Sequence, residues 1–228
     1  MKSNLIYHVC PQNNPMLKFN IDQLGLYWKT FTGQKIINVA AGPGLLTLET
    51  VKAMFTEAGC TGAEFILSGN DPSRETKMFI TKLLPAVKSD SASEATFFAH
   101  SKGITAPDKG ECRKWAEYMY RLNLKDPKKV FSVLVSQTFA GIFKVGNCGV
   151  HIPSWHYSGT FFWFNHKKLF SLKTWDKIEI GRYGVEAYPG TQVSSSQGAC
   201  LAYPNLGGVH SLYQARTWEA IEKGEVLP

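Results

Sequence analysis

The sequence predicts an α/β fold: a mostly parallel, Rossmann-like sheet with helices on both faces, in a single domain. Short apolar runs, typical of buried strands, alternate with longer segments whose apolar residues recur every three or four positions, as in amphipathic helices. With 228 residues, of which 44% are apolar and 13% aromatic, the chain can form one large core. We expect a domain over residues 1–190, followed by a flexible segment or lid, packed on the same domain, over 191–228.

The first half of the chain is expected to contain three strand–helix pairs. Three apolar runs predict strands: residues 5–9, 35–39 and 63–67. Three amphipathic segments predict helices: residues 17–31, 47–58 and 73–87. Gly33 and Gly59 follow the first two of these helices, where glycine commonly ends a helix.

The second half continues the alternation. Three further apolar runs predict strands: residues 95–99, 138–143 and 161–164. Two segments predict helices: residues 112–124 and 127–135. The glycine-rich segment 141–149 is expected to be a mobile surface loop, and His166 to lie in a solvated turn. Glu186 is expected to begin a short element that Pro189 ends, and past Pro189 no regular pattern remains.

Charge and cysteine content narrow the class of protein. The chain has 25 Lys and Arg against 18 Asp and Glu, a formal charge of +7, which favours anionic ligands such as nucleotides. These basic residues are scattered, so nucleic acid is not an expected partner. The five cysteines form no Cys-x-x-Cys pair, which indicates free thiols in a reducing compartment. Because we find neither a signal peptide nor a transmembrane segment, we expect a cytoplasmic protein, with peripheral membrane contact left open.

Ligands of open parallel α/β sheets bind beyond the carboxyl ends of the strands, where the loops converge. Four loops are expected there: residues 10–14, 41–44, 70–74 and 100–103. The last is the sharpest candidate, because His100, Ser101 and Lys102 leave the end of a buried strand together and Gly103 allows close backbone approach. The alternative is that no ligand binds here: Lys102 is then solvated, and His100 is a histidine that simply ends its strand.

A second candidate is the run of aromatic residues that begins at Trp155. Here Ser158 and Gly159 precede the strand at 161–164, and the acidic residue Glu186 follows later. Glycine lets the backbone pass close to a neighbour or ligand. Flat aromatic rings such as Trp155 and Tyr157 can stack on sugar faces, although alternate strand positions must point into the core.

Four segments together resemble a group of GT-A-type glycosyltransferases that includes proteins similar to rhamnan-synthesis polysaccharide transferases. In chain order they are Tyr7-His8, the segment 97–103 (Phe-Phe-Ala-His-Ser-Lys-Gly), the helix with Arg113-Lys114-Trp115 and Met119-Tyr120, and the segment 155–163. The resemblance spans roughly residues 5–190, and the order and spacing of the motifs carry it. It implies transfer of a sugar from a nucleotide-diphosphate donor to a glycan or other hydroxyl acceptor, as in surface polysaccharide assembly.

The resemblance also implies roles for individual residues. Glu186 would be the catalytic base. The donor diphosphate would bind His100, Ser101, Lys102 and Gly103. The nucleoside would lie near Tyr7, His8, Asp71 and Glu75. The acceptor would contact Trp155, His156, Tyr157, Ser158 and Gly159.

Metal use stays open. GT-A enzymes usually hold Mn²⁺ or Mg²⁺ with an Asp-x-Asp motif at the strand end, and this chain has none. Lys102 is a physical substitute as a point charge on the diphosphate. His210, late in the chain, is the remaining candidate metal contact, with a surface histidine as its alternative.

Two other functions compete with sugar transfer. Gly42-Pro43-Gly44 after a strand is similar to the cofactor loop of a Rossmann methyltransferase that binds S-adenosylmethionine, although a lone Gly-x-Gly is weak evidence and a tight turn is the simpler explanation. A non-catalytic protein that binds a nucleotide-sugar is the third reading. For Glu186 the alternative is a carboxylate at a helix N-terminus, and for Asp71 a helix cap.

Overall fold

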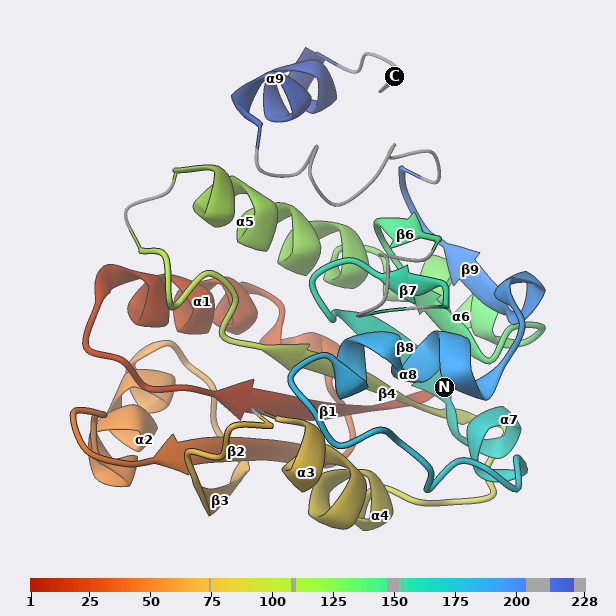
Figure 1. Cartoon of the computed structure of the whole chain (residues 1–228), viewed down its shortest axis with the longest axis horizontal. Coiled ribbons are helices and arrows are strands. Elements are labelled where there is room, and N and C mark those ends of the chain that lie inside the picture. The colour runs from red at the N-terminus through yellow and green to blue at the C-terminus, as the bar shows by residue number, and fades with distance from the viewer. Residues whose placement is uncertain (74, 108–109, 147–151, 153, 204–213, 224–228) are drawn as a thin grey trace.

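The computed structural model describes the chain except for residues 74, 108–109, 147–151, 153, 204–213 and 224–228. Its described residues form an α/β domain around one seven-stranded, mostly parallel mixed sheet (Figure 1). The strand order is β3 (Glu64–Gly69), β2 (Lys35–Ala41), β1 (Lys2–Val9), β4 (Glu94–His100), β8 (Phe162–Asn165), β5 (Phe139–Gly141) and β9 (Gly198–Cys200). The first four are mutually parallel, β8 runs antiparallel to both its neighbours, and β9 is parallel to β5.

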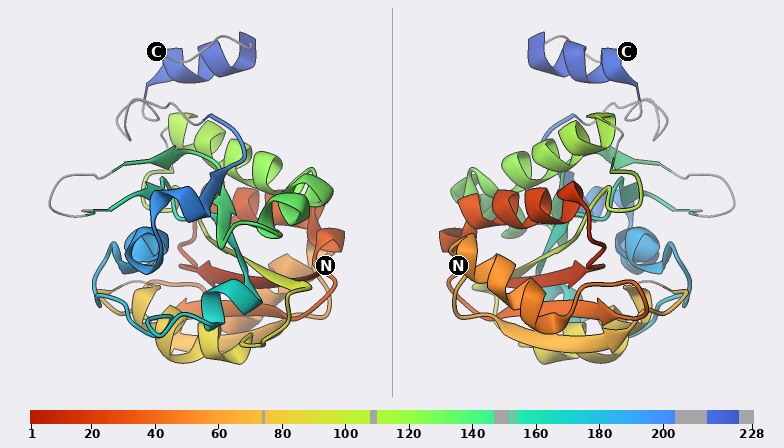
Figure 2. Two further views of the ribbon diagram at one scale, coloured as in Figure 1. Left: turned by 90° about the vertical axis from the view of Figure 1, so that its right-hand side faces the viewer. Right: turned by 90° about the vertical axis from the view of Figure 1, so that its left-hand side faces the viewer.

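Helices cover both faces of this sheet, as predicted (Figure 2). One face packs against α1 (Pro15–Leu26), α2 (Leu48–Glu57), α5 (Gly110–Leu124) and α6 (Pro127–Leu134). The other packs against a helical segment formed by α3 (Thr76–Met78), a π-helical turn (Phe79–Leu83) and α4 (Leu84–Ala86), and against α7 (His166–Phe170) and α8 (Gly184–Gln192). Successive side chains of β1 show why both faces must be covered: Leu5 and Tyr7 belong to the first core, and Ile6 belongs to the second.

Several elements depart from the sequence prediction. The first helix ends at Leu26, and a separate 3₁₀ turn follows at Trp28–Thr30. The helix expected at 73–87 begins at Thr76 and contains the π turn. Pro189 lies inside α8 and does not end it; the proline is buried, and it cannot donate the backbone hydrogen bond that the helix interior would otherwise have there.

The chain beyond Pro189 contains regular structure that the sequence analysis missed. A 3₁₀ turn at Ser195–Gln197 leads into β9, and α9 (Ala215–Lys223) packs Trp218 against Tyr118 of α5. A small two-stranded sheet, β6 (Lys144–Val145) with β7 (His156–Tyr157), includes part of the expected glycine-rich loop. The four described cysteines form no disulfide. In the described part of the chain, no helix combines the length and the apolar character needed to cross a membrane.

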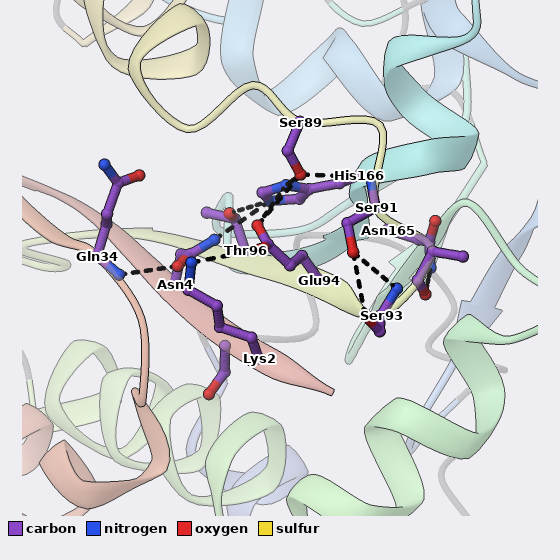
Figure 3. A network of polar contacts seen from close by, with 12 residues as sticks. Lys2, Asn4, Gln34, Ser89, Ser91, Ser93, Glu94, Thr96, Asn165 and His166 are labelled. Carbon is purple, nitrogen blue, oxygen red and sulfur yellow. Dashed lines mark hydrogen bonds and ion pairs between the residues drawn. The ribbon is translucent and has the colours of Figure 1, made fainter.

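His166 is buried, so the prediction of a solvated turn is wrong. Its ring joins the start of α7 to β4: Nε2 lies 2.7 Å from Thr96 Oγ1, and Nδ1 lies 2.9 Å from Ser89 Oγ and 3.5 Å from Glu94 Oε2 (Figure 3). Burial lowers the pKa of His166 to about 4. A neutral imidazole therefore links α7 to the sheet near the amino end of β4, away from the strand ends that carry the site.

Candidate functional site

A cleft of about 460 Å³ opens at the carboxyl ends of β1 and β4. The strand order reverses between these two strands, and at such a point an open α/β sheet binds its ligands. Three of the four predicted loops contribute to its wall, through Cys10, Asn70 and the loop at 100–103, but the loop at 41–44 does not. The remaining lining residues are His8, Glu75, Ile104, Thr105, Ala106, Cys112, Trp115, Ile152, His156, Thr160, Arg182, Tyr183 and Glu186.

Hydrogen bonds fix the loop after β4. Ser101 Oγ accepts a hydrogen bond of 3.1 Å from the backbone N–H of Cys10, which ties together the two loops at the switch point. Asn20 of α1 holds Lys102 by its backbone: Lys102 N donates to Asn20 Oδ1 at 3.0 Å, and Asn20 Nδ2 donates to Lys102 O at 2.9 Å. Gly103 has φ +76°, and a Cβ there would lie 3.1 Å from Met16. The loop is therefore rigidly built and specific for glycine at that turn.

Two cations reach the cleft from different parts of the chain. The Nζ atom of Lys102 lies 3.7 Å from the centre of the Trp115 ring, a cation–π contact. Arg182 projects from the segment before α8 and is exposed. Neither forms an ion pair with any residue that the structure describes. Burial lowers the pKa of Lys102, and the negative charge of Glu186 opposes this effect. The cleft thus offers positive charge to a ligand.

Glu186 lies in the first turn of α8, facing the same cleft. Its Oε1 accepts a hydrogen bond of 2.8 Å from the backbone N–H of Gly159, and the Gly159 carbonyl accepts one of 3.1 Å from His100 Nε2. Gly159 has φ +93°, and a Cβ there would lie 2.6 Å from Met119 Cε. One glycine therefore orients both side chains through its own backbone, and any other residue in its place would be strained by the positive φ and crowded against Met119.

These contacts define the state of His100. Because a carbonyl only accepts hydrogen bonds, the proton must lie on Nε2, which leaves Nδ1 bare. Burial, assisted by the charge of Lys102, lowers the pKa of His100 to about 4. His100 is therefore neutral at physiological pH. Its 3.8 Å contact from Nδ1 to Glu75 Oε1 is not an ion pair, and the histidine adds no positive charge for a diphosphate.

Of the four residues predicted to bind the nucleoside, two line the cleft. Glu75 is 7% exposed, and burial raises its pKa. His8 also lines the cleft, with Nδ1 2.6 Å from Asn38 Nδ2. Tyr7 points the other way, into the core, where its hydroxyl lies 2.7 Å from that of Tyr120. Asp71 stays outside the lining and accepts hydrogen bonds from the backbone N–H and the hydroxyl of Ser73. It does not cap a helix, because α3 begins at Thr76 and has Glu75 at its N-cap position.

Most of the residues predicted to bind the acceptor are structural. Trp155 donates from Nε1 to the carbonyl of Val193, and Tyr157 donates from its hydroxyl to Ala199 O at 2.8 Å, so both rings are buried beside β9. Ser158 is also buried outside the cleft lining. They turn inward because the chain after 190 forms β9, which the sequence pattern did not reveal.

His156 does line the cleft, although it is 0% exposed. Nδ1 faces the carbonyl of Ser154 at 3.5 Å, whereas Nε2 has no hydrogen-bond partner among the residues that the structure describes. Burial lowers the pKa of His156, and the charge of Glu186 opposes this. Sequence reasoning missed Trp115 and Arg182 as site residues. Trp115 lies on the apolar stripe of α5, so its sequence context indicated a core residue. For Arg182, the sequence signal is its position four residues before Glu186.

The described residues do not fit a metal site. At the strand end where the GT-A resemblance implies metal-binding carboxylates, this chain has His100, Ser101 and Lys102, and an ammonium group repels a cation. Among the described residues, no three His, Cys, Asp or Glu side chains are grouped so that they could hold a metal ion. His210 lies outside the described residues. The charge that faces an anionic ligand here comes from Lys102 and Arg182.

The sequence matches no protein-family model and no curated protein. The function must therefore be inferred from the geometry of the cleft, in which a held carboxylate, two cations without ion pairs and a buried Glu–His pair converge. A Rossmann-like fold by itself is compatible with many activities.

Proposed function

We propose that the protein is a GT-A-type glycosyltransferase, which moves a sugar from a nucleotide-diphosphate donor to a hydroxyl acceptor in surface polysaccharide assembly. One observation carries the proposal: the cleft at the switch point combines a carboxylate held by a backbone N–H with a positively charged wall. The first suits deprotonation of a hydroxyl, and the second suits a diphosphate leaving group.

The donor binds through Lys102 and Arg182. Both are cations without a protein counter-ion in the described chain, and Lys102 is partly desolvated against Trp115. A diphosphate that enters the cleft gains charge-assisted hydrogen bonds from these groups, and the attraction is stronger than in water because the site is partly buried. Their positive charge also stabilises the negative charge that develops on the leaving diphosphate during transfer.

Glu186 is the base. Gly159 N–H occupies Oε1, and no other described residue hydrogen-bonds the carboxylate, so an acceptor hydroxyl can reach the other oxygen. In the reaction, the hydroxyl proton passes to Glu186 while the hydroxyl oxygen bonds to the anomeric carbon of the sugar. The bond from that carbon to the diphosphate oxygen breaks, and the nucleoside diphosphate leaves with the electron pair. Held by Gly159, the carboxylate needs no reorientation before it accepts the proton.

The two competing functions receive less support from the cleft. The Gly42-Pro43-Gly44 loop of the methyltransferase reading follows β2, one strand away from the switch point, and does not line the cleft. A non-catalytic nucleotide-sugar-binding protein would need the cationic wall, but it would not need a carboxylate at Glu186 that is held in place by a strained glycine.

A thermal-shift titration tests the proposal. Wild-type protein is titrated with UDP, GDP, CDP, dTDP and S-adenosylmethionine, each with and without Mn²⁺, because a ligand of the folded state raises Tm by mass action. We expect one nucleoside diphosphate to stabilise the protein without Mn²⁺. Lys102→Ala should remove that stabilisation, whereas Lys128→Ala, an exposed lysine on α6, should retain it. Stabilisation by S-adenosylmethionine alone would refute the proposal in favour of the methyltransferase, and binding without sugar transfer would favour the non-catalytic protein.

A further inference from the structure

Glu75 is a buried carboxyl group at the floor of the cleft that forms no hydrogen bond with another described side chain. It is 7% exposed, and its Oε1 lies 3.8 Å from Nδ1 of His100. This distance is too long for a hydrogen bond. Apart from a hydrogen bond with its own backbone, the carboxyl group has no hydrogen-bond partner among the described residues. A buried acid that is satisfied so incompletely is costly, so its presence beside the switch point indicates a ligand that completes it.

On the side that faces Glu75, the ring of His100 also forms no hydrogen bond with any described residue. His100 Nε2 carries the ring proton and donates it to the Gly159 carbonyl, so Nδ1 is a lone-pair acceptor. An ionised Glu75 would place two acceptors face to face in a desolvated site. One proton on Glu75 turns this repulsion into attraction, since the carboxylic acid then donates toward Nδ1.

Four titratable residues lie around Glu75 and influence whether it is ionised. His8 of β1 and Lys102 favour its ionised form, whereas Glu186 of α8 disfavours it, and His100 of β4 is neutral. Burial is the largest influence and raises the pKa of Glu75. This direction agrees with the geometry, because a proton on Glu75 would face the lone pair of His100 Nδ1.

We propose that Glu75 and His100 together bind one hydroxyl group of the sugar that is transferred, and so determine specificity for a hydroxyl-bearing ring. A hydroxyl both donates and accepts, so it can donate to His100 Nδ1 and accept from the Glu75 carboxylic acid. An oxygen about 2.8 Å from each atom forms a triangle on their 3.8 Å separation, so neither side chain has to move. A phosphate oxygen, which only accepts, or an ammonium group, which only donates, leaves one partner unpaired.

This inference rests on the proposed function and names the part of the donor that the floor of the cleft recognises. The cations Lys102 and Arg182 bind the diphosphate, whereas Glu75 and His100 bind the sugar. The two contributions can be separated, because a nucleoside diphosphate contains the first part alone and a nucleotide-sugar contains both.

Isothermal titration calorimetry of the full chain separates them. The probes are UDP, GDP, CDP and dTDP and their glucose or mannose conjugates, measured between pH 6 and pH 9. We expect Glu75→Leu to weaken nucleotide-sugar binding by about tenfold or more, the loss typical of a buried hydrogen bond, and to leave nucleoside diphosphate binding unchanged. Glu64→Leu replaces an exposed carboxylate on β3 and serves as the control.

The pH dependence gives a readout that a purely structural role would not change. In the wild type, the added affinity for the sugar should fall as pH rises through the pKa of Glu75. In Glu75→Gln, whose amide always carries protons, that dependence should disappear while sugar binding is retained. Equal weakening of both ligand types by Glu75→Leu, or an unchanged pH dependence in Glu75→Gln, would overturn the inference. Failure of every nucleoside diphosphate to bind the wild type would instead overturn the proposed function.

Discussion

Acid should destabilise this fold through a histidine far from the cleft. His166 has 0% of its side chain exposed and a pKa lowered from 6.5 to about 4. In the unfolded chain the ring takes up a proton below pH 6.5, whereas in the folded chain it does so only below about 4. Its contribution to stability is therefore fully present above pH 6.5, falls as pH drops through the window between 6.5 and 4, and is about 3 kcal/mol smaller at the bottom of that window.

Urea unfolding at pH 7 and pH 5 measures the effect. Between these two values, proton binding to unfolded His166 should lower the free energy of unfolding by about 2 kcal/mol, a large part of a typical domain stability of about 5–15 kcal/mol. Other groups titrate in the same range, so wild type is compared with His166→Gln, which retains hydrogen-bonding groups for Thr96 and Ser89. The variant should be less stable at pH 7, but its loss between pH 7 and pH 5 should be about 2 kcal/mol smaller.

Equal losses in the two proteins would refute the reasoning, because the ring would then titrate alike in the folded and unfolded states. A second measurement does not depend on the variant. The NMR chemical shift of the His166 ring in the folded wild type should stay that of a neutral imidazole down to about pH 4. A midpoint near the ordinary value of 6.5 would contradict burial as the controlling factor.

Three other predictions concern the cleft. Glu186→Gln should lower kcat about 100-fold or more in an assay of nucleoside diphosphate release, and it should retain donor binding. A variant with wild-type turnover would show that the base lies elsewhere. Glu179→Gln, which changes an exposed carboxylate, is the control. Gly159→Ala should destabilise the protein to urea by at least about 1 kcal/mol more than Gly62→Ala, which shares a positive φ but has open space around it, and equal effects would exclude the steric cost. Arg182→Ala should weaken nucleoside diphosphate binding and reduce its dependence on salt, and an unchanged salt dependence would remove this arginine from the donor site.

The fold was predictable because its strongest signals are local. The alternation of buried strands with amphipathic helices up to residue 135 identified β1 to β4 and the helices between them, with boundaries shifted by a few residues. The last part was not predictable in this way, because β9 has three residues and no apolar alternation of its own. It exists because β5 offers a partner edge, and that is a property of the tertiary structure.

The same distinction explains which site residues were found. His100, Lys102 and Glu186 follow from strand ends and a helix start, positions that the sequence pattern can locate. The aromatic residues at 155 and 157 were misassigned. Along a strand, alternate side chains point to opposite faces of the sheet, but the sequence does not show which of these faces another element will cover. Once β9 and the segment before it pack beside them, Trp155 and Tyr157 must be core.

Gly159 shows how local sequence and tertiary structure together determine the site. Its sequence context suggested only close approach of the backbone, whereas its actual role is to give its N–H to Glu186 and its carbonyl to His100. The second bond fixes the tautomer of His100, the tautomer leaves Nδ1 bare, and the bare nitrogen makes a proton on Glu75 favourable. The orientation of one peptide unit thus links the proposed base to the proposed sugar-binding pair. A change at Gly159 should therefore alter the pH dependence of sugar binding as well as the rate of transfer.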